Sequence, residues 1–206
     1  MQKWKTWQQI DKELYPIPTS VKATLRAYQH KGYEWLRLLG EMGAGACLAD
    51  DMGLGKTIQT ICFIASQLEK NPEDKFIIVC PSSLIYNWKN ELEKFLPTAK
   101  SYIHYGAQRK FENFFKDDAQ IIITAYSTLR VDIELMKAVI WNTIVLDESH
   151  NIKTLYAQAT KAVYEIIAKH KIALSGTPIM NNTYDLYAQL NYLLPSFLGT
   201  QEFFRN

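Results

Sequence analysis

The chain has 206 residues, of which 48% are hydrophobic and 21% are charged, and its formal net charge is +2. This composition fits one large globular domain with a full core and excludes a disordered chain. The nearly neutral charge neither requires nor excludes nucleic acid, so a nucleic-acid-binding face would have to be a local patch. Three cysteines, Cys47, Cys62 and Cys80, lie far apart in apolar stretches. This pattern argues against a disulfide framework or a zinc site and predicts a reducing compartment.

Prolines mark the end of a first segment of the chain, and apolar runs mark the elements that follow it. Residues 1–20 are polar and aromatic and end in Pro16 and Pro18, which predicts an extended N-terminal extension before a domain of residues 21–206. Continuous apolar runs then alternate with amphipathic segments. The runs predict strands at residues 46–49, 76–80, 102–105, 120–124, 143–146 and 171–174. The amphipathic segments predict helices at residues 24–39, 55–69, 85–96, 111–115, 128–136, 155–168 and 184–194.

The predicted strands are unbroken apolar runs, which is typical of strands that are buried on both faces. Helices between such strands supply right-handed crossovers. The predicted fold is therefore α/β, a mainly parallel sheet flanked by helices on both faces. Ligands of such sheets bind beyond the carboxyl ends of the strands. Polar clusters of this chain fall there, at residues 50–57, 81–83, 124–127, 147–150 and 175–178, and they predict a single site.

The first polar cluster follows a strand and opens a helix. It matches the phosphate-loop pattern G-x-x-x-x-G-K-[ST] at Gly55, Lys56 and Thr57, while Asp50 stands at the first glycine position and Gly53 supplies an internal glycine. In such a loop the backbone N–H groups surround phosphate oxygens, the lysine reaches the β- and γ-phosphates, and the Thr57 hydroxyl ligates Mg²⁺. The pattern predicts nucleotide binding, and an ordinary turn that contains Gly-Leu-Gly-Lys is the alternative.

The second informative cluster is Asp147-Glu148-Ser149-His150, which follows the apolar run 143–146. A nucleotide hydrolase needs one carboxylate to hold Mg²⁺ and another to polarise the attacking water. Asp147 is the better metal candidate because it comes first after the strand, and Glu148 is the candidate base. A solvated acidic turn is the alternative. His150 is expected in a polar coupling role or simply as a loop residue.

Ser175-Gly176-Thr177-Pro178 follows the last predicted strand. Its two hydroxyls could bond the γ-phosphate region or the carboxylate loop. A plain turn with capping hydroxyls is the interpretation that this short motif favours by itself.

Together, these motifs resemble the first motor lobe of superfamily 2 helicases, and specifically of the Snf2-like (SWI2/SNF2) ATPases, from about Leu25 to Phe204. The segment around Gln29 resembles the family's adenine-contacting segment, and residues 50–59 resemble its motif I, which tolerates a residue such as Asp50 in place of glycine. Similar matches to motifs Ia, Ib, II and III lie at residues 79–91, 123–126, 147–150 and 174–182. Six motifs in this order make the resemblance specific to this family.

The resemblance implies a RecA-like P-loop NTPase lobe of a double-stranded DNA translocase that hydrolyses ATP with Mg²⁺, like the chromatin-remodelling ATPases. The implied nucleotide-binding residues are Gln29, Asp51, Met52, Gly53, Leu54, Gly55, Lys56 and Thr57. The implied catalytic residues are Lys56, Asp147 and Glu148, with Thr57 and Asp147 on the metal. Candidate neighbours of DNA phosphates are Pro81, Ser82, Ser83, Thr124 and Tyr126. Candidate coupling residues are His150, Ser175, Gly176 and Thr177.

Members of this family also need a second RecA-like lobe, which carries arginines that complete the ATP site. We therefore expect these residues to be a domain excised from a longer protein, with weak ATP binding and poor hydrolysis by the isolated lobe. A nucleotide-binding interaction module without turnover and an RNA helicase lobe are the two alternatives. No apolar run approaches the ~18 residues of a membrane span, so no membrane partner is expected. The expected location is cytoplasmic and nucleoid-associated in a bacterium, or nuclear in a eukaryote.

Overall fold

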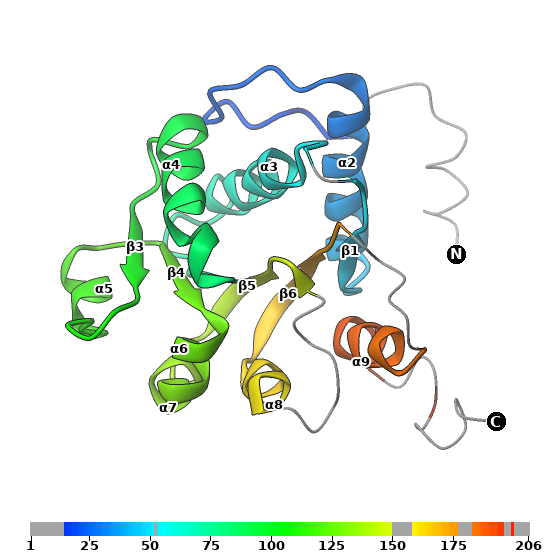
Figure 1. The fold of residues 1–206 in the computed structure, drawn as a ribbon. Helices are drawn as coiled ribbons and strands as arrows, with labels where there is room; N and C mark the ends of the chain where they lie inside the picture. Colours follow the sequence, from blue (N-terminus) through cyan, green and yellow to red (C-terminus); the bar gives the residue numbers. More distant parts are fainter. Residues whose placement is uncertain (1–14, 52, 150–157, 177–182, 196–198, 200–206) are drawn as a thin grey trace.

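The computed structural model describes residues 15–51, 53–149, 158–176, 183–195 and 199 (Figure 1). These residues form a six-stranded sheet in the order β1-β6-β5-β2-β4-β3, and every described strand pair is parallel. The strands are β1 (Ala46–Leu48), β2 (Phe76–Cys80), β3 (Ser101–His104), β4 (Ile121–Ala125), β5 (Trp141–Leu146) and β6 (Ala168–Leu174).

Helices cover both faces of the sheet, as predicted (Figure 1). Alternate residues of one strand point to opposite faces, so Ile78 belongs to one apolar cluster and Ile77 to the other. The Ile78 cluster includes residues of α2 (Ala27–Glu41), α3 (Lys56–Leu68) and α4 (Ile85–Phe95). The Ile77 cluster includes residues of α5 (Glu112–Lys116), α6 (Tyr126–Val131), α7 (Ile133–Lys137), α8 (Gln158–Glu165) and α9 (Thr183–Leu193). The α/β fold with a parallel sheet is therefore confirmed.

Two predicted element boundaries were wrong for identifiable reasons. Strand β6 begins at Ala168 rather than at residue 171, so helix α8 ends at Glu165 and does not reach residue 168. The charged side chains in Lys169-His170-Lys171 hid the start of the strand, although His170 is buried. The single helix predicted at residues 128–136 is two helices that meet at Asp132. The Asp132 carboxylate accepts hydrogen bonds from Arg109, a tertiary contact that local spacing does not reveal.

In the part of the chain that the structure describes, no helix has the length and apolar character that crossing a membrane requires.

Candidate nucleotide-binding site

The loop between β1 and α3 has the backbone of a phosphate loop. Gly53 and Gly55 have φ angles of 85° and 81°, a left-handed conformation that glycine adopts without steric cost. A Cβ atom on Gly55 would also collide with the side-chain amide nitrogen of Gln29. Helix α3 begins at Lys56, directly after the second glycine, so the positive end of its dipole lies at the loop. Met52 lies outside the described residues.

The side chain of Lys56 folds back over this loop. Its ammonium donates hydrogen bonds to the carbonyl oxygens of Asp50, at 2.7 Å, and of Asp51, at 3.0 Å. The neighbouring Thr57 is half-buried, and its hydroxyl makes no hydrogen bond with any of the described residues. The loop therefore presents a cation at its centre and a hydroxyl beside it, which is the donor set that a nucleotide phosphate with Mg²⁺ would use.

Two glutamine side chains join helix α2 and helix α3 to the loop. Gln29 accepts a hydrogen bond from the Arg26 N–H at 2.9 Å through Oε1, and its Nε2 donates to the Leu54 carbonyl at 3.4 Å. Gln59, which is fully buried, donates from Nε2 to the same carbonyl at 3.5 Å. The adenine contact predicted for Gln29 stays a prediction, and the structure adds that its amide supports the loop.

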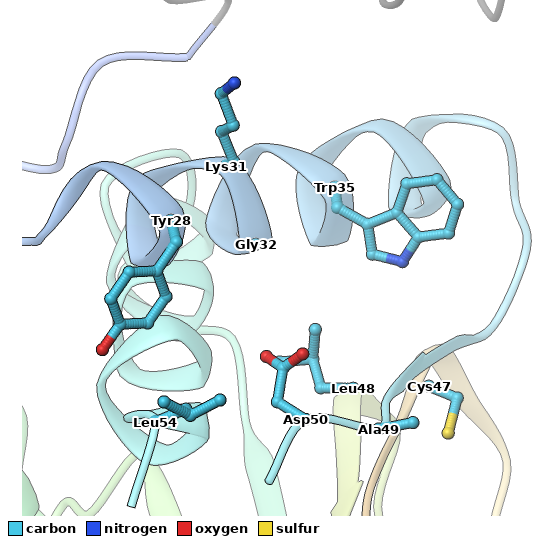
Figure 2. A pocket seen from close by; sticks show the side chains of 9 residues that line it. All are labelled: Tyr28, Lys31, Gly32, Trp35, Cys47, Leu48, Ala49, Asp50 and Leu54. Carbon is cyan, nitrogen blue, oxygen red and sulfur yellow. The ribbon is translucent and has the colours of Figure 1, made fainter. Parts of the chain in front are cut away.

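A cavity of about 540 Å³ lies between helix α2 and the strand end that leads into the loop (Figure 2). Its walls are Tyr28, Lys31, Gly32 and Trp35 from α2, and Cys47, Leu48, Ala49, Asp50 and Leu54 from β1 and the loop. In Figure 2 the Tyr28 ring points toward Leu54, whereas Lys31 points away from the loop. Tyr28 and Trp35 lie in the helix that the sequence predicts at residues 24–39. Their spacing at i and i+7, with Gly32 at i+4, was the available signal that one helix face lines a cavity.

Asp147 lies directly after β5, and its carboxylate is held from two sides. Trp88 Nε1 of helix α4 donates to Oδ2 at 2.7 Å, and the Glu148 backbone N–H donates to Oδ1 at 2.9 Å. Burial raises the pKa of Asp147, whereas these two donors and the positive charge of Lys56 act in the opposite direction. Strands β1 and β5 both pair with β6, so the phosphate loop and the acidic pair lie at the same edge of the sheet. Trp88 lies in the predicted helix 85–96 and in the segment that resembles motif Ia, but its contact with Asp147 was not predicted.

Tyr126 contacts the same aspartate through the backbone. Its hydroxyl donates to the Asp147 carbonyl oxygen at 2.8 Å, and burial raises the pKa of this phenol well above its usual value. Trp88 and Tyr126 come from the two segments that resemble motifs Ia and Ib. Both segments therefore reach the acidic pair directly, one at the side chain and one at the main chain.

Glu148 has an unusual backbone conformation, with a φ angle of 47°. A residue with a side chain rarely adopts this left-handed region, and strain of this kind concentrates at functional sites. Ser149, the next residue, is fully buried, and its hydroxyl has no hydrogen-bond partner among the described residues. His150 lies outside the described part of the chain.

The segment after β6 is tied to the strand that precedes the phosphate loop. The backbone N–H of Ser175 donates to the Leu48 carbonyl oxygen at 3.1 Å. Ser175 is fully buried and Gly176 is half-buried, while Thr177 lies outside the described residues. The predicted coupling residues Ser175 and Gly176 are therefore at the same sheet edge as the loop, and their role stays a prediction.

The residues predicted to adjoin DNA separate into exposed and buried groups. Ser82 and Ser83 are exposed in a short 3₁₀ turn that follows Pro81 at the carboxyl end of β2. Thr124 is fully buried, and its hydroxyl donates to the His104 carbonyl oxygen at 2.9 Å. The Thr124 hydroxyl therefore has a hydrogen-bond partner within the chain, as the Tyr126 hydroxyl does. The DNA contacts of all five residues stay a prediction, and only the exposed serines present hydroxyls on the surface.

A parallel sheet with a lysine-bearing glycine loop after β1 and an acidic pair after β5 defines a RecA-like nucleotide-binding lobe. Comparison with known proteins identifies the family: the model of the SNF2-related domain matches residues 28–206, and the chain belongs to this family.

Similar proteins and similar solved structures are consistent with membership of this family. The chain is 39% identical over 205 residues to the TATA-binding protein-associated factor MOT1 of Saccharomyces cerevisiae, a match that covers 93% of the chain and 11% of MOT1. It is 37% identical to Helicase swr1 of Schizosaccharomyces pombe, covering 87% of the chain and 14% of that protein. The structure of a Sulfolobus solfataricus SWI2/SNF2 ATPase core in complex with double-stranded DNA matches with a TM-score of 0.84 and 39% identity. That match covers 93% of this chain and 40% of the Sulfolobus chain, so this chain spans only a part of each relative.

Proposed function

We propose that this chain is the ATP-binding lobe of a DNA-dependent ATPase that moves along double-stranded DNA and hydrolyses ATP to ADP and phosphate. One observation carries the proposal. The phosphate loop and the Asp147–Glu148 pair follow β1 and β5 at one edge of the parallel sheet, where both strands pair with β6. Membership of the SNF2-related family supports the assignment to DNA motors.

Within this proposal each polar group of the site has a task. The backbone of residues 51–57 surrounds the phosphates, and Lys56 leaves the carbonyls of its own loop to bind the β- and γ-phosphates. Thr57 and Asp147 hold Mg²⁺, which when bound neutralises the charge that develops on the phosphates. Glu148 polarises the attacking water. The residues fit such a metal because the Thr57 hydroxyl is unpaired among the described residues and because two donors hold the Asp147 carboxylate in place.

The cavity beside the loop is our candidate for the nucleoside end of ATP. It offers the Tyr28 and Trp35 rings as apolar walls, and Gln29 lies next to it on α2. Ligand sites of this kind combine aromatic walls with a few polar groups. Reading of the base by Gln29 requires its amide to give up the weak 3.4 Å contact with Leu54.

DNA binding is proposed for the sheet edge that carries Pro81, Ser82 and Ser83. Exposed hydroxyls and backbone N–H groups bind phosphates without reading the sequence. The similar Sulfolobus solfataricus structure is a complex with double-stranded DNA, which supports duplex DNA as the substrate. Thr124 and Tyr126 lie beneath this edge. They remain candidate neighbours of the DNA phosphates, and we assign Ser175, Gly176, Thr177 and His150 to the coupling of DNA binding and ATP hydrolysis.

Efficient hydrolysis is proposed to need a second RecA-like lobe. An arginine that enters the site from another domain contributes a factor of about 10³–10⁵ to turnover in comparable enzymes. We therefore propose that residues 21–206 form the ATP-binding domain of a two-lobe protein, preceded by an extension of residues 1–20. The isolated lobe is expected to bind ATP weakly and to hydrolyse it slowly.

The test is the ATPase rate of the full-length protein that contains this chain, with and without duplex DNA or RNA. We expect stimulation by duplex DNA. Glu148→Gln should abolish turnover and retain ATP binding, whereas Lys56→Ala should weaken both. Stimulation by RNA alone would identify an RNA helicase lobe. Tight ATP binding without any nucleic-acid stimulation or turnover would identify an interaction module. Equal turnover by the isolated lobe would contradict the need for a second lobe.

A further inference from the structure

A second cavity, of about 200 Å³, lies between helices α2 and α3 and the start of β6. We call it the basal cavity because it adjoins the amino end of the sheet. His170 lies four residues before Leu174 on β6, or roughly 13 Å along the strand at 3.3 Å per residue, and Leu174 pairs with Leu48 just before the phosphate loop. The basal cavity is lined by Arg37, Gly40, Glu41, Phe63, Gln67, Lys70, Lys169 and His170. No described residue lines both this cavity and the cavity beside the phosphate loop.

The base of this cavity contains buried side-chain nitrogens that have no hydrogen-bond partner among the described residues. His170 is 7% exposed, and neither of its ring nitrogens has a hydrogen-bond partner among the described residues. The Nε atom of Arg37 is likewise buried and unpaired within the described part of the chain. Buried polar groups in folded proteins nearly always have a partner, and an unpaired group therefore points to a ligand or an ordered water.

The orientation of His170 is set by its neighbours rather than by a polar partner. Its ring meets the Phe63 ring edge-on, with centroids 5.4 Å apart. A Cβ atom on Gly40 would lie only 3.2 Å from His170 Nδ1, so a larger residue there would press on the ring. The packing therefore holds the imidazole in a fixed position within the cavity wall.

The charge of the cavity favours an anion with two negative charges. Of the described residues that line the cavity, Arg37, Lys70 and Lys169 are cationic and Glu41 is the only carboxylate, which gives these residues a net charge of +2 with His170 neutral. A phosphate monoester or free phosphate carries about two negative charges at neutral pH, whereas a carboxylate carries one. A water molecule takes about 30 Å³ in the liquid, so a cavity of about 200 Å³ has room for a phosphate group.

We propose that the basal cavity is a binding site for a phosphate dianion, with Arg37 and His170 at its base and Lys70 and Lys169 at its mouth. Both lysines are exposed, so the ligand enters from solvent between them. Arginine and lysine donors form charge-assisted hydrogen bonds to phosphate oxygens. The site is separate from the proposed ATP site, and free phosphate and a phosphorylated side chain share the chemistry that it recognises.

The imidazole of His170 provides a local reporter for this site. Burial and the charges of Lys169, Lys70 and Arg37 lower the pKa of His170 to about 4. Inorganic phosphate still carries about one negative charge near pH 4 and gains the second above about pH 6, so bound phosphate would favour the imidazolium and would raise this pKa. The experiment follows the histidine ring signals of the 206-residue chain by NMR across pH, with and without about 10 mM phosphate, against chloride of equal ionic strength. The chain has four histidines, so His170→Gln assigns the signal.

We expect phosphate to raise the pKa of His170 by about one unit or more. The double variant Lys70→Ala/Lys169→Ala, which changes only exposed residues, should weaken the response at least about tenfold. Lys161→Ala on the exposed surface of α8 is the matched control and should keep the response. Lys56→Ala should keep it too, which separates this site from phosphate bound at the phosphate loop.

Three results would overturn the proposal: no movement of the His170 signal with phosphate, an equal movement with chloride, or an undiminished response in the double lysine variant. A comparison of inorganic phosphate with O-phosphoserine then distinguishes the two sources. A stronger response to O-phosphoserine assigns the site to a phosphorylated side chain, and a stronger response to inorganic phosphate assigns it to the free ion.

Discussion

The indole nitrogen of Trp88 donates a hydrogen bond of 2.7 Å to Oδ2 of Asp147, across 59 positions of sequence. This bond joins helix α4, which follows the exposed serines at residues 82 and 83, to the carboxylate that we propose as a metal ligand. Any displacement of α4 on binding DNA would therefore act on the orientation of that carboxylate. The bond also favours the ionised form of Asp147 against the effect of burial.

Trp88→Phe tests this role because it keeps an aromatic ring and removes the donor. The pKa of Asp147 should rise further, so the loss of Mg²⁺-dependent ATP binding on acidification should begin at a higher pH than in the unaltered chain. The free energy of unfolding should fall by about 2–4 kcal/mol. ATP binding as a function of pH, with and without Mg²⁺, and denaturant unfolding of the 206-residue chain measure the two effects.

Trp141→Phe is the matched control for this prediction. Trp141 is as buried as Trp88, at 1% exposure, but its indole donates to the neutral carbonyl of Met136 at 2.8 Å. For Trp141→Phe we expect a similar fall in the free energy of unfolding and no change in the pH dependence of ATP binding. If both variants shift the profile equally, the Trp88 bond has no specific effect on the metal site.

Glu148→Gly should separate stability from activity. Glycine adopts the φ of 47° without the strain that a side chain imposes, so the folded state should gain about 0.5–1 kcal/mol. Turnover of the full-length protein should be lost with the proposed base. The exposed Asp118, with a φ of 51°, is the other described residue with a side chain in this region, and Asp118→Gly should give a similar gain with unchanged turnover. Thermal unfolding and ATPase rates measure both, and a loss of stability in Glu148→Gly would contradict the strain argument.

Much of the fold could be predicted because burial on both faces leaves a direct trace in the sequence. The run Phe76–Cys80 was predicted with its observed boundaries because all five side chains are buried. Strand β6 left a weaker trace, since its first residues carry charges and only the parallel partner β5 shows that they belong to the sheet. The break at Asp132 depends on contacts with His104 and Arg109, which lie more than 20 residues away.

The candidate site was predictable as a set of motifs but not as a set of contacts. The residues after each strand could be assigned to one sheet edge, because parallel strands end there together. The local sequence pattern does not determine the order of the strands in the sheet, so the proximity of α4 and the end of β5 could not be inferred. The contacts of Lys56 with its own loop and the left-handed backbone of Glu148 depend likewise on the folded geometry.

Gly32→Ala should disturb the phosphate loop through Gln59. A Cβ atom at residue 32 would collide with Gln59 Oε1 and would lie 2.8 Å from its Cδ. Gln59 would then have to leave the Leu54 carbonyl, so we expect a loss of about 1–3 kcal/mol in the free energy of unfolding and weaker ATP binding. The double variant Gly32→Ala/Gln59→Ala removes the collision. Its loss in the free energy of unfolding should therefore be smaller than the sum of the losses in the two single variants. Additive effects would mean that the collision is not the cause.

The stability of the chain should fall on acidification between about pH 6.5 and pH 4 because of His170. Its pKa is about 4 in the folded chain and about 6.5 when unfolded. Between these values the unfolded chain binds a proton that the folded chain does not, so stability rises with pH across this window and changes little outside it. The difference amounts to at most about 3 kcal/mol.

Other charged groups face His170 and bear on this pH dependence of stability. The positive charges of Lys169, Lys70 and Arg37 lower the pKa of His170, and the Glu41 carboxyl of α2 lines the same cavity. His170→Gln should therefore flatten the dependence above about pH 5. Urea unfolding at a series of pH values measures it, with Lys161→Ala as the control that keeps the slope. Because bound phosphate stays anionic across this window and favours the imidazolium in the folded chain, phosphate should reduce the loss of stability on acidification in the unaltered chain and have no such effect in His170→Gln.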